Sequence, residues 1–488
     1  MADKDKDDRG LSWGVLSWPN YFMRPHEKFA AIAYAFLALV LLAVLAIAVS
    51  LLLRVLFAAF GPENLEPIKS ADDFNKILLG LGGLIGAVTA VPFLIWRTLI
   101  AQKQNSLAQE NLHSTTMVKA IEQLGAMKEE KVTQDGTDAD GKPTAQMATN
   151  SRPNIELRLG AIYLLEKLAR EHEQLHWPIM EILCAYVREN AGPPQGPPKE
   201  VVAAYASGLF QRSVEQRKLI EQRERTIDSP RVDVQAAITV IGRRSATQVK
   251  IEKFLLRLGH FQYRLDFSNC NLYKLHIDGM NFDLANFSKS CLELSSFRNI
   301  NLSNTNFSNS YLQGASIFAS ELDASFIQNA NLQGASIMQS TLINCNFANS
   351  NFDGAGLMGN RLHGSDFSDA NFRKTNLFRN HFEATYLAGT NFEKADITGS
   401  VFDDAWIFSA DFTTAKGFMP EMAARAWGRM DTNLPEGIEK PASEKWAFDP
   451  NIDILELYNK WQKRHEYWTS EALKVRMIPK SYLDIELK

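Results

Sequence analysis

The chain has 488 residues, which allows several domains. Its 52 Lys and Arg residues against 56 Asp and Glu residues give a net charge of −4, which excludes a globally basic nucleic-acid binder and a globally acidic disordered chain. Four cysteines with no CxxC pair exclude a disulfide framework and a thiolate zinc site.

Two apolar runs follow the N-terminal tail. Residues 29–53 comprise 25 positions, and residues 77–96 comprise 20 positions, without a charged side chain. At about 1.5 Å per residue, each run is long enough to cross a hydrocarbon core of ~30 Å. The pattern predicts a transmembrane hairpin within residues 29–100, with the lipid bilayer as its partner.

Basic residues near the two runs predict their orientation. The tail, residues 1–28, holds five Lys or Arg residues, whereas the connecting segment 61–76 holds two Lys residues against four acids. Basic flanks stay on the cytoplasmic side of a membrane. Both termini are therefore expected in the cytoplasm, and Trp13, Trp18 and Tyr21 suit the membrane interface before the first span.

The second run carries the small residues Gly82, Gly86 and Ala90 at four-residue spacing. Such residues let helix backbones approach closely in lipid. They predict packing against the first span or contact between copies of the chain, and both alternatives stay open. The runs contain no ionisable residue, so an anchor is favoured over a channel.

Residues 101–260 are predicted to form a helical stalk and a helical domain. Low hydrophobicity predicts a linker at 131–153, and the sequence AGPPQGPPKE predicts another at 191–200. A surplus of basic residues within 212–257 is interpreted as the solvated face of a helix, rather than a surface for anionic lipid or nucleic acid.

Two motifs in this region imitate enzyme sites. His172 and His176 match HExxH, but Pro178 is expected to end or kink the helix and no third zinc ligand follows at a suitable spacing. Residues 136–142 resemble a phosphate-binding loop, yet Pro143 replaces the required Ser or Thr. We therefore expect no enzyme activity, no catalytic residue, no metal and no cofactor.

A period of five residues fills the next part of the chain. Thirty positions at this spacing, from Phe267 to Phe412, hold thirteen Phe, eleven Leu and six Ile. The residue two positions earlier is usually small, and the residue directly before is often Asn, which suggests turn chemistry. A coil with four straight sides would then contain twenty residues and stack its large side chains inside.

This pattern resembles the pentapeptide-repeat family, whose A(D/N)LxX motif occurs as 330–334 and 370–374. The resemblance implies a right-handed quadrilateral β-helix over residues 261–418. Helical segments such as 157–170 and 232–244 look like those of bacterial membrane-anchored pentapeptide-repeat proteins. The resemblance implies a location at the bacterial inner membrane, and it brings no catalytic residue.

The cysteines of the repeat region are expected to be structural. Cys270 and Cys345 fall on the inward row of small residues, so they are predicted to be small core residues. Cys291 falls on an outward position, where a lone cytoplasmic thiol is weak evidence for redox chemistry.

The C-terminal segment, residues 419–488, is rich in large aromatic residues. It is expected either to cap the last coil, as repeat ends require, or to form a surface for a partner or a second copy. The aromatic residues concerned are Trp427, Trp446, Trp461, Tyr467 and Trp468.

These features together predict a membrane-anchored α+β protein that serves as a non-enzymatic scaffold or protein-interaction module. The protein partner is unidentified, and self-association is the alternative. A rival hypothesis is an oligomeric membrane effector or channel subunit that the rod gates. Mimicry of DNA towards a topoisomerase is least favoured and nucleic acid is an unlikely partner, because Glu321 and Asp323 are the only charges between Asn299 and Phe352.

Overall fold

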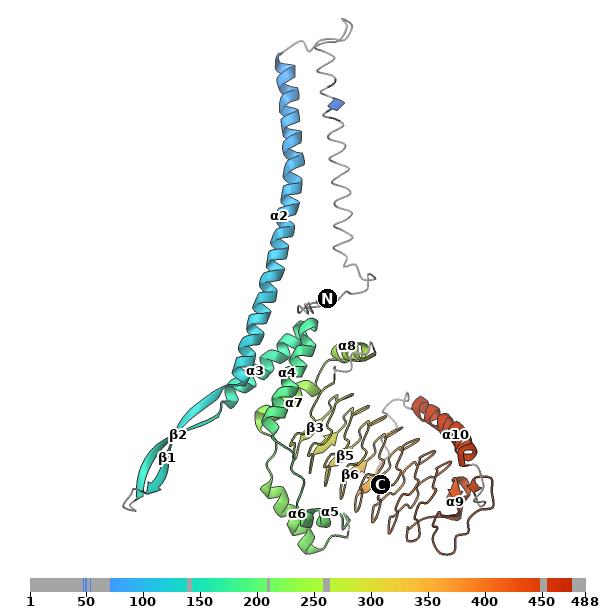
Figure 1. Ribbon diagram of the computed structural model, residues 1–488. Helices are drawn as coiled ribbons and strands as arrows, with labels where there is room; N and C mark the ends of the chain where they lie inside the picture. Colours follow the sequence, from blue (N-terminus) through green and yellow to red (C-terminus); the bar gives the residue numbers. More distant parts are fainter. Residues whose placement is uncertain are drawn as a thin grey trace, which may run out of the picture. The chain divides into compact units, whose positions relative to one another are not determined.

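The chain divides into two compact units, Met1–Ser114 and Thr115–Lys488. The second unit contains the repeats and the helices attached to them. A computed structural model describes residues 47, 49, 50, 53, 71–137, 143–208, 211–257, 264–447 and 454–475 (Figure 1).

A helix of 54 residues, α2, runs from Ala71 to Leu124. Among the described residues, no helix combines the length and the apolar character that crossing a membrane requires. The transmembrane hairpin expected from the sequence is therefore not found in this part of the chain. Its second run, 77–96, lies within α2, whereas its first run, 29–53, lies outside the described residues except at four positions.

The small residues of the second run lie in the helical backbone of α2. Gly82, Gly86 and Ala90 belong to this helix, and the Ala90 side chain is exposed. Their part in helix packing stays a prediction.

The segment expected as a linker at 131–153 belongs largely to a β-hairpin, which corrects the prediction. β1 (Met127–Thr137) and β2 (Pro143–Pro153) pair antiparallel along their whole length. Each strand satisfies the backbone groups of the other. Because the segment is polar throughout, it lacks the alternation of apolar and polar residues that reveals a half-buried strand in a sequence.

Helices form the part of the second unit that precedes the repeats. The structure gives α3 (Ile155–Glu171), α4 (Glu173–Ala191), α5 (Lys199–Tyr205), α6 (Val214–Thr226), α7 (Val232–Gly242) and α8 (Ala246–Arg257). The Asn154 side chain caps α3 by accepting a hydrogen bond from the Leu157 nitrogen. Of the segment 191–200, residues 192–198 form neither helix nor strand, whereas Ala191 ends α4 and Lys199 begins α5.

Pro178 does not end the helix in which it lies, contrary to the prediction. It is the sixth residue of α4, which continues to Ala191. A proline so near the start removes only one helical hydrogen bond. Full burial of Ile179 and Leu183 offsets that loss.

A buried carboxylate joins α3, α4 and α7. Asp233 is fully buried, pairs with Arg231 at 2.7 Å and accepts a hydrogen bond from the Tyr186 hydroxyl at 2.5 Å. Arg158 of α3 approaches the same carboxylate at 3.6 Å. Burial alone would raise the pKa of Asp233, but the hydrogen bonds from Arg231 and Tyr186 lower it below its usual value.

The repeats form a β-helix in which each coil pairs with the next in parallel at a spacing of twenty residues, from Asp266 with Asn286 to Asp396 with Lys416. One side is regular enough to form a five-stranded sheet, in the order β3-β4-β5-β6-β7. Its strands are β3 (His276–Asp278), β4 (Ser296–Arg298), β5 (Ser316–Phe318), β6 (Ser336–Met338) and β7 (Gly356–Met358). The β-helix and the coil length of twenty residues are thus confirmed.

The large residue at every fifth position points into the rod. All thirty of these side chains are buried, and none exceeds 4% exposure. Many phenylalanines stack on the equivalent residue one coil away: Phe372 lies 4.8 Å from Phe352 and 5.3 Å from Phe392, measured between ring centroids. Such offset stacks stabilise the column beyond the area that they bury.

Turn chemistry explains the asparagines of the repeat, as predicted. Asn281 Oδ1 accepts a hydrogen bond from the Asp283 nitrogen at 2.9 Å, and Asn301 and Asn351 do the same two residues on. The corners themselves need a left-handed backbone, with φ between +49° and +73° at positions such as Asn299 and Gly399. Asn and Gly adopt this conformation at least cost.

Chain segments outside the repeats cover both ends of the rod. At the start, the Gly242 carbonyl at the end of α7 accepts a hydrogen bond from the Asn281 nitrogen at 2.8 Å. At the far end, the β-helix continues past its predicted limit at 418, because Trp406 pairs with Trp427 and Asp411 pairs with Asn433. The elements there are α9 (Pro420–Arg425), β8 (Gly428–Arg429), β9 (Trp446–Ala447) and α10 (Ile454–Val475).

The stacked phenylalanines make a direct prediction about stability. Phe372→Ala should lower the free energy of unfolding by about 3–5 kcal/mol, since it leaves a cavity between two stacked rings. Urea unfolding followed by circular dichroism measures the change. Phe378→Ala, one repeat later on the exposed surface, is the matched control and should change stability by less than about 0.5 kcal/mol. Equal losses in the two variants would contradict this account of the core.

Candidate interaction surfaces

Strands β5, β6 and β7 and the coil after them carry a row of large apolar side chains on the outer surface of the rod. We call this row the Phe–Met ladder; it consists of Phe318, Met338, Met358 and Phe378, which occupy the same position in successive coils. The side chains of Phe318 and Phe378 are 39% and 36% exposed. Those of Met338 and Met358 are partly buried. Parallel pairing fixes the ladder, because Phe318 lies opposite Met338 and Met338 lies opposite Met358.

Small residues lie beside the ladder, and an arginine lies at each of its ends. The other outward position of β5, β6 and β7 holds Ser316, Ser336 or Gly356. Arg298 lies opposite Phe318 in the sheet, and the Arg379 guanidinium lies 4.8 Å from the centre of the Phe378 ring. Glu321 and Asp323 flank the inward Leu322 and belong to a different side of the coil. This side of the rod therefore presents an apolar row with a basic residue at each end, and a contiguous apolar row is typical of interaction surfaces.

A second side of the rod is covered by α5, α6 and their connection (Figure 1). The Tyr205 hydroxyl donates a hydrogen bond to Glu293, and Arg223 pairs with the same carboxylate at 2.9 Å. Close approach requires glycine beneath this segment: a Cβ atom at Gly314 would lie 2.7 Å from the Tyr205 ring, and one at Gly354 would lie 2.5 Å from the Gly208 nitrogen. This side is occupied by the chain itself.

The same cover explains the environment of Cys291. The residue lies on an outward position, as predicted, but Ile227 and Tyr273 pack over it and bury it fully. Burial raises the pKa of the Cys291 thiol to about 12. Cys270 and Cys345 are buried in the inward row, as the sequence predicts. The thiols are therefore protonated and shielded at neutral pH.

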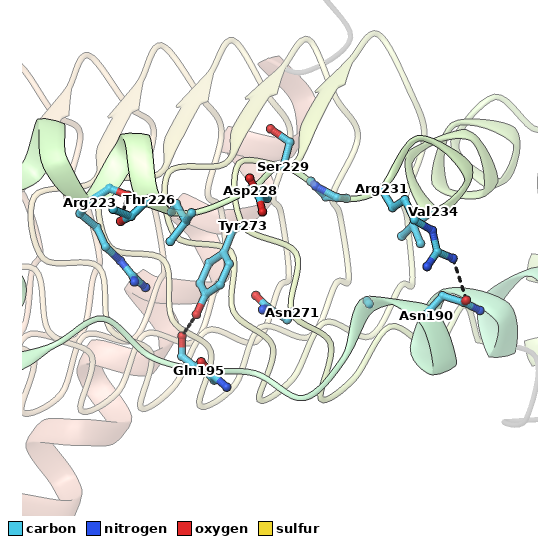
Figure 2. Close-up of a pocket in the computed structure, with 13 residues that line it drawn as sticks. Asn190, Gln195, Arg223, Thr226, Asp228, Ser229, Arg231, Val234, Asn271 and Tyr273 are labelled. Atoms are coloured by element: carbon cyan, nitrogen blue, oxygen red, sulfur yellow. Dashed lines mark hydrogen bonds between the residues drawn. The ribbon is translucent and has the colours of Figure 1, made fainter. Parts of the chain in front are cut away.

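A polar pocket of about 390 Å³ lies between the helical part and the first coil (Figure 2). Its two arginines are committed to carboxylates: Arg223 pairs with Glu293, and Arg231 pairs with Asp233 while donating to Asn190 at 2.7 Å. The hydrogen bonds of these arginines hold α6 and α7 in place. The pocket is therefore best explained as a polar contact region that holds the helices on the first coil, rather than as a binding site.

The HExxH histidines do not share one helix. His172 is the non-helical residue between α3 and α4, whereas His176 lies in α4 and is only 1% exposed. His176 Nε2 lies 2.7 Å from Glu252, and its Nδ1 lies 3.0 Å from the Gln248 amide nitrogen. Both nitrogens of His176 are thus taken up by hydrogen bonds inside the helical part.

The C-terminal aromatic residues converge on one carboxylate, Asp404. Its side chain accepts hydrogen bonds from the indoles of Trp427 and Trp468, at 3.3 and 2.8 Å, and from Lys445 at 2.8 Å. Its backbone carbonyl accepts a fourth, from the Trp461 indole at 2.8 Å. The aromatic residues stand out in the sequence but Asp404 does not, because an acid on a coil surface has no distinguishing spacing.

Three of the five predicted aromatic residues are occupied inside the chain. Trp427, Trp446 and Trp461 are buried, and the Trp446 indole donates to the Ala423 carbonyl at 3.0 Å. Trp468 is half-buried, and Tyr467 is exposed. The structure thus brings four tryptophans together over the last coils, and the exposed Tyr467 meets Trp468 at their edge, with 6.0 Å between ring centroids.

A group of two histidines and one glutamate was also missed in the sequence. His363, His381 and Glu383 lie on the side of the rod next to α10, and one possible ligand atom from each lies within 4.8 Å of the others. The only signal in the sequence was that His363 and Glu383 are separated by one coil length of twenty residues.

Comparisons with known proteins support the pentapeptide-repeat family for the β-helix. The family model for pentapeptide repeats matches 8 copies, within residues 266–304, 290–317, 340–379 and 375–413. No curated protein sequence matches the chain.

Two solved structures are among those similar to this chain. HetL, a pentapeptide-repeat protein involved in heterocyst differentiation regulation from the cyanobacterium Nostoc sp. strain PCC 7120, is 14% identical, with coverage of 42% of this chain and 95% of HetL and a TM-score of 0.23. Full-length QnrB1, a plasmid-mediated fluoroquinolone resistance protein, is 18% identical, with coverage of 39% and 98% and a TM-score of 0.13.

The Asp404 hydrogen bonds predict a pH-dependent end of the rod. Burial alone would raise the pKa of Asp404, but the hydrogen bonds from Lys445 and Trp468 lower it below its usual value. A carboxyl with a lowered folded pKa stabilises the fold above its unfolded value of about 4, and this contribution is lost as pH falls through the folded pKa. Asp404→Asn should therefore destabilise α10 by about 2–3 kcal/mol at pH 7.

Hydrogen exchange of the α10 amides measures this effect across pH. Wild type and Asp404→Asn should differ most at pH 7 and converge well below pH 4, where the wild-type carboxyl is protonated. Asp403→Asn is the control, because Asp403 forms an exposed pair with Arg425 at 3.3 Å that contributes little. A constant difference at all pH values would contradict the role given to the Asp404 charge.

Proposed function

We propose that this chain is a non-enzymatic protein-interaction module whose rod presents the Phe–Met ladder to a protein partner. The observation that carries the proposal is a row of four large apolar side chains along one side of the rod, of which the two phenylalanines are exposed and the two methionines partly buried. Soluble surfaces rarely keep such a row unless it binds something.

The ladder has the dimensions of a binding anchor. Adjacent coils are spaced by about 4.8 Å, so the four side chains form a row of roughly 14 Å. Burying them contributes about 25 cal/mol per Å² of apolar area removed from water. Phe and Met are also residue types that interfaces favour at their centres. The serines and glycine beside the ladder allow a partner to approach the sheet closely.

We further propose that the apolar first part of the chain attaches this rod to a membrane, with both termini in the cytoplasm of a bacterial cell. The charge-free run 77–96 and its basic flank support this, as does the exposure of Phe93, Leu94, Ile95 and Trp96 on α2. Tethering would confine the ladder to a layer near the membrane and raise its effective concentration towards partners there.

The two other functions have weaker support. A channel would need a polar or ionisable stripe in its spans, which the two runs lack in sequence. A DNA mimic would need a dense row of negative charge, since duplex DNA carries one charge per about 1.7 Å. Apolar Phe318 and Met338 occupy the middle of the rod instead.

A photocrosslinking amino acid tests the ladder directly. We place p-benzoylphenylalanine at Met338 or Met358 in the full chain, in its native cells, and expect one specific adduct from both sites. The same probe at Phe326 is the control, because that side chain is 48% exposed on a different side of the coil. Adduct mass and peptide sequence separate a distinct partner from a second copy.

Substitution links the adduct to the apolar row. Phe318→Ser should reduce the adduct formed at Met358 at least about tenfold, since loss of an aromatic anchor from an interface costs about 2 kcal/mol. Folding of the variant is checked by its thermal transition. An equal adduct from Phe326, or an adduct that Phe318→Ser leaves unchanged, would overturn the proposed docking role.

Introduced cysteines test the proposed membrane topology. The four native cysteines are buried, so they give little background. In intact cells, a membrane-impermeant maleimide should label Asn64→Cys in the connecting segment, but not Ser106→Cys, which lies beyond the second run. Permeabilised cells should show labelling of Ser106→Cys, because this position of α2 is exposed. External labelling of Ser106→Cys would contradict the topology and leave the ladder proposal untouched.

A further inference from the structure

His363, His381 and Glu383 come together because of the coil length. His363 follows the inward Leu362, and Glu383 follows the inward Phe382, so the two occupy the same position in adjacent coils. His381 lies on the other side of Phe382 and reaches the same carboxylate. The β-helix therefore holds three potential metal ligands on rigid backbone without any loop.

The buried atoms of this group are incompletely satisfied. His363 is 8% exposed and Glu383 is 6% exposed. Neither His363 Nδ1 nor Glu383 Oε2 has a hydrogen-bond partner, although the two atoms face each other across 3.7 Å. Buried polar atoms without a hydrogen-bond partner are costly, and an ion that bound both atoms would remove that cost.

We propose that His363, His381 and Glu383 bind one divalent transition-metal ion, and that Zn²⁺ fits the site best. Two imidazoles and one carboxylate are a ligand set that zinc takes, with a fourth position left for water. Tetrahedral zinc with bonds of about 2.1 Å needs ligand atoms roughly 3.4 Å apart. The ligand atoms lie within 4.8 Å of one another, and the buried pair is already at 3.7 Å.

The third ligand provides the route for the ion. The His381 side chain is 50% exposed, and its Nδ1–H donates a hydrogen bond to Glu383 Oε1 at 2.9 Å. When Nδ1 binds the metal, a neutral His381 carries its ring proton on Nε2 instead, and the ion contacts Glu383 and His363 together. The site is thus open on the His381 side and closed on the other.

The charges around the site favour a neutral imidazole at the buried position. Burial lowers the pKa of His363, whereas the hydrogen bond to Glu383 raises the pKa of His381. Arg361 opposes a positive charge on either ring, and Glu383 favours one. Because a histidine must be unprotonated to bind metal, affinity should fall as the solution is acidified.

The site also borders the C-terminal helix. Trp468 of α10 meets the His363 ring edge to face at 6.4 Å between centroids. His465 Nε2–H of the same helix donates to the Gly364 carbonyl at 3.0 Å. A metal ion that fixes His363 would therefore tie two adjacent coils together directly beneath α10.

Titration of the full chain with Zn²⁺, after treatment with a chelator, tests the proposal. We expect one tightly bound ion per chain by calorimetry and a tetrahedral absorption spectrum when Co²⁺ replaces Zn²⁺. His381→Ala should weaken binding at least about 100-fold, since loss of an outer partner alone costs ~10–100-fold. His276→Ala, an exposed histidine on the same rod, should bind like wild type.

The variants keep the test independent of folding. His381 is exposed, so His381→Ala should retain the wild-type thermal transition without metal, and Glu383→Gln removes the charged ligand with little change in shape. A rise in the thermal transition with Zn²⁺ in wild type but not in His381→Ala supports the site. Failure to bind one ion per chain, or equal affinity in wild type and His381→Ala, would overturn it.

Discussion

Pairing of each coil with the next is the constraint on which this molecule depends. The Phe267 nitrogen donates to the Asn286 carbonyl at 2.7 Å, and equivalent bonds repeat every twenty residues along the rod. A coil thus satisfies its backbone only if another coil follows, and the first and last coils would expose unpaired groups. The end of α7 and the residues around Trp427 cover those groups. Helical and aromatic segments of the sequence that share no repeat are therefore as necessary to the rod as the repeats themselves.

The constraint also explains which features the sequence predicts. A large side chain every fifth residue is required in every coil. The pattern that predicts the β-helix and its coil length therefore occurs at thirty positions of the sequence. The hairpin of β1 and β2 buries no comparable row, and its polar strands resemble a linker. Asp404 and the group of His363, His381 and Glu383 each depend on contacts between distant residues. Such contacts leave no local period in the chain, so only the folded structure brings them into view.

The sides of the rod are used differently because only the inward positions are constrained. One side is covered by α5 and α6, with glycines such as Gly354 where backbones meet closely. Another lies beside α10 and holds the histidines. Strands β5, β6 and β7 and the coil after them carry the Phe–Met ladder, which separates the proposed docking surface from the proposed metal site. Changes on one side can then alter one property without disturbing the shared core.

Two segments of the chain, one around α5 and the other α10, each contact several coils at once and so limit changes in the number of coils. The segment around α5 contacts the rod from Glu293 to Lys374, and α10 contacts it from Gly364 to Trp406. Tandem repeats commonly gain or lose units through unequal recombination. Here, an added or deleted coil of twenty residues would move the rod residues that one of these segments contacts by about 4.8 Å per coil. The length of this rod is therefore inherited as a whole, and its variation among descendants should be confined to substitutions rather than changes in repeat number.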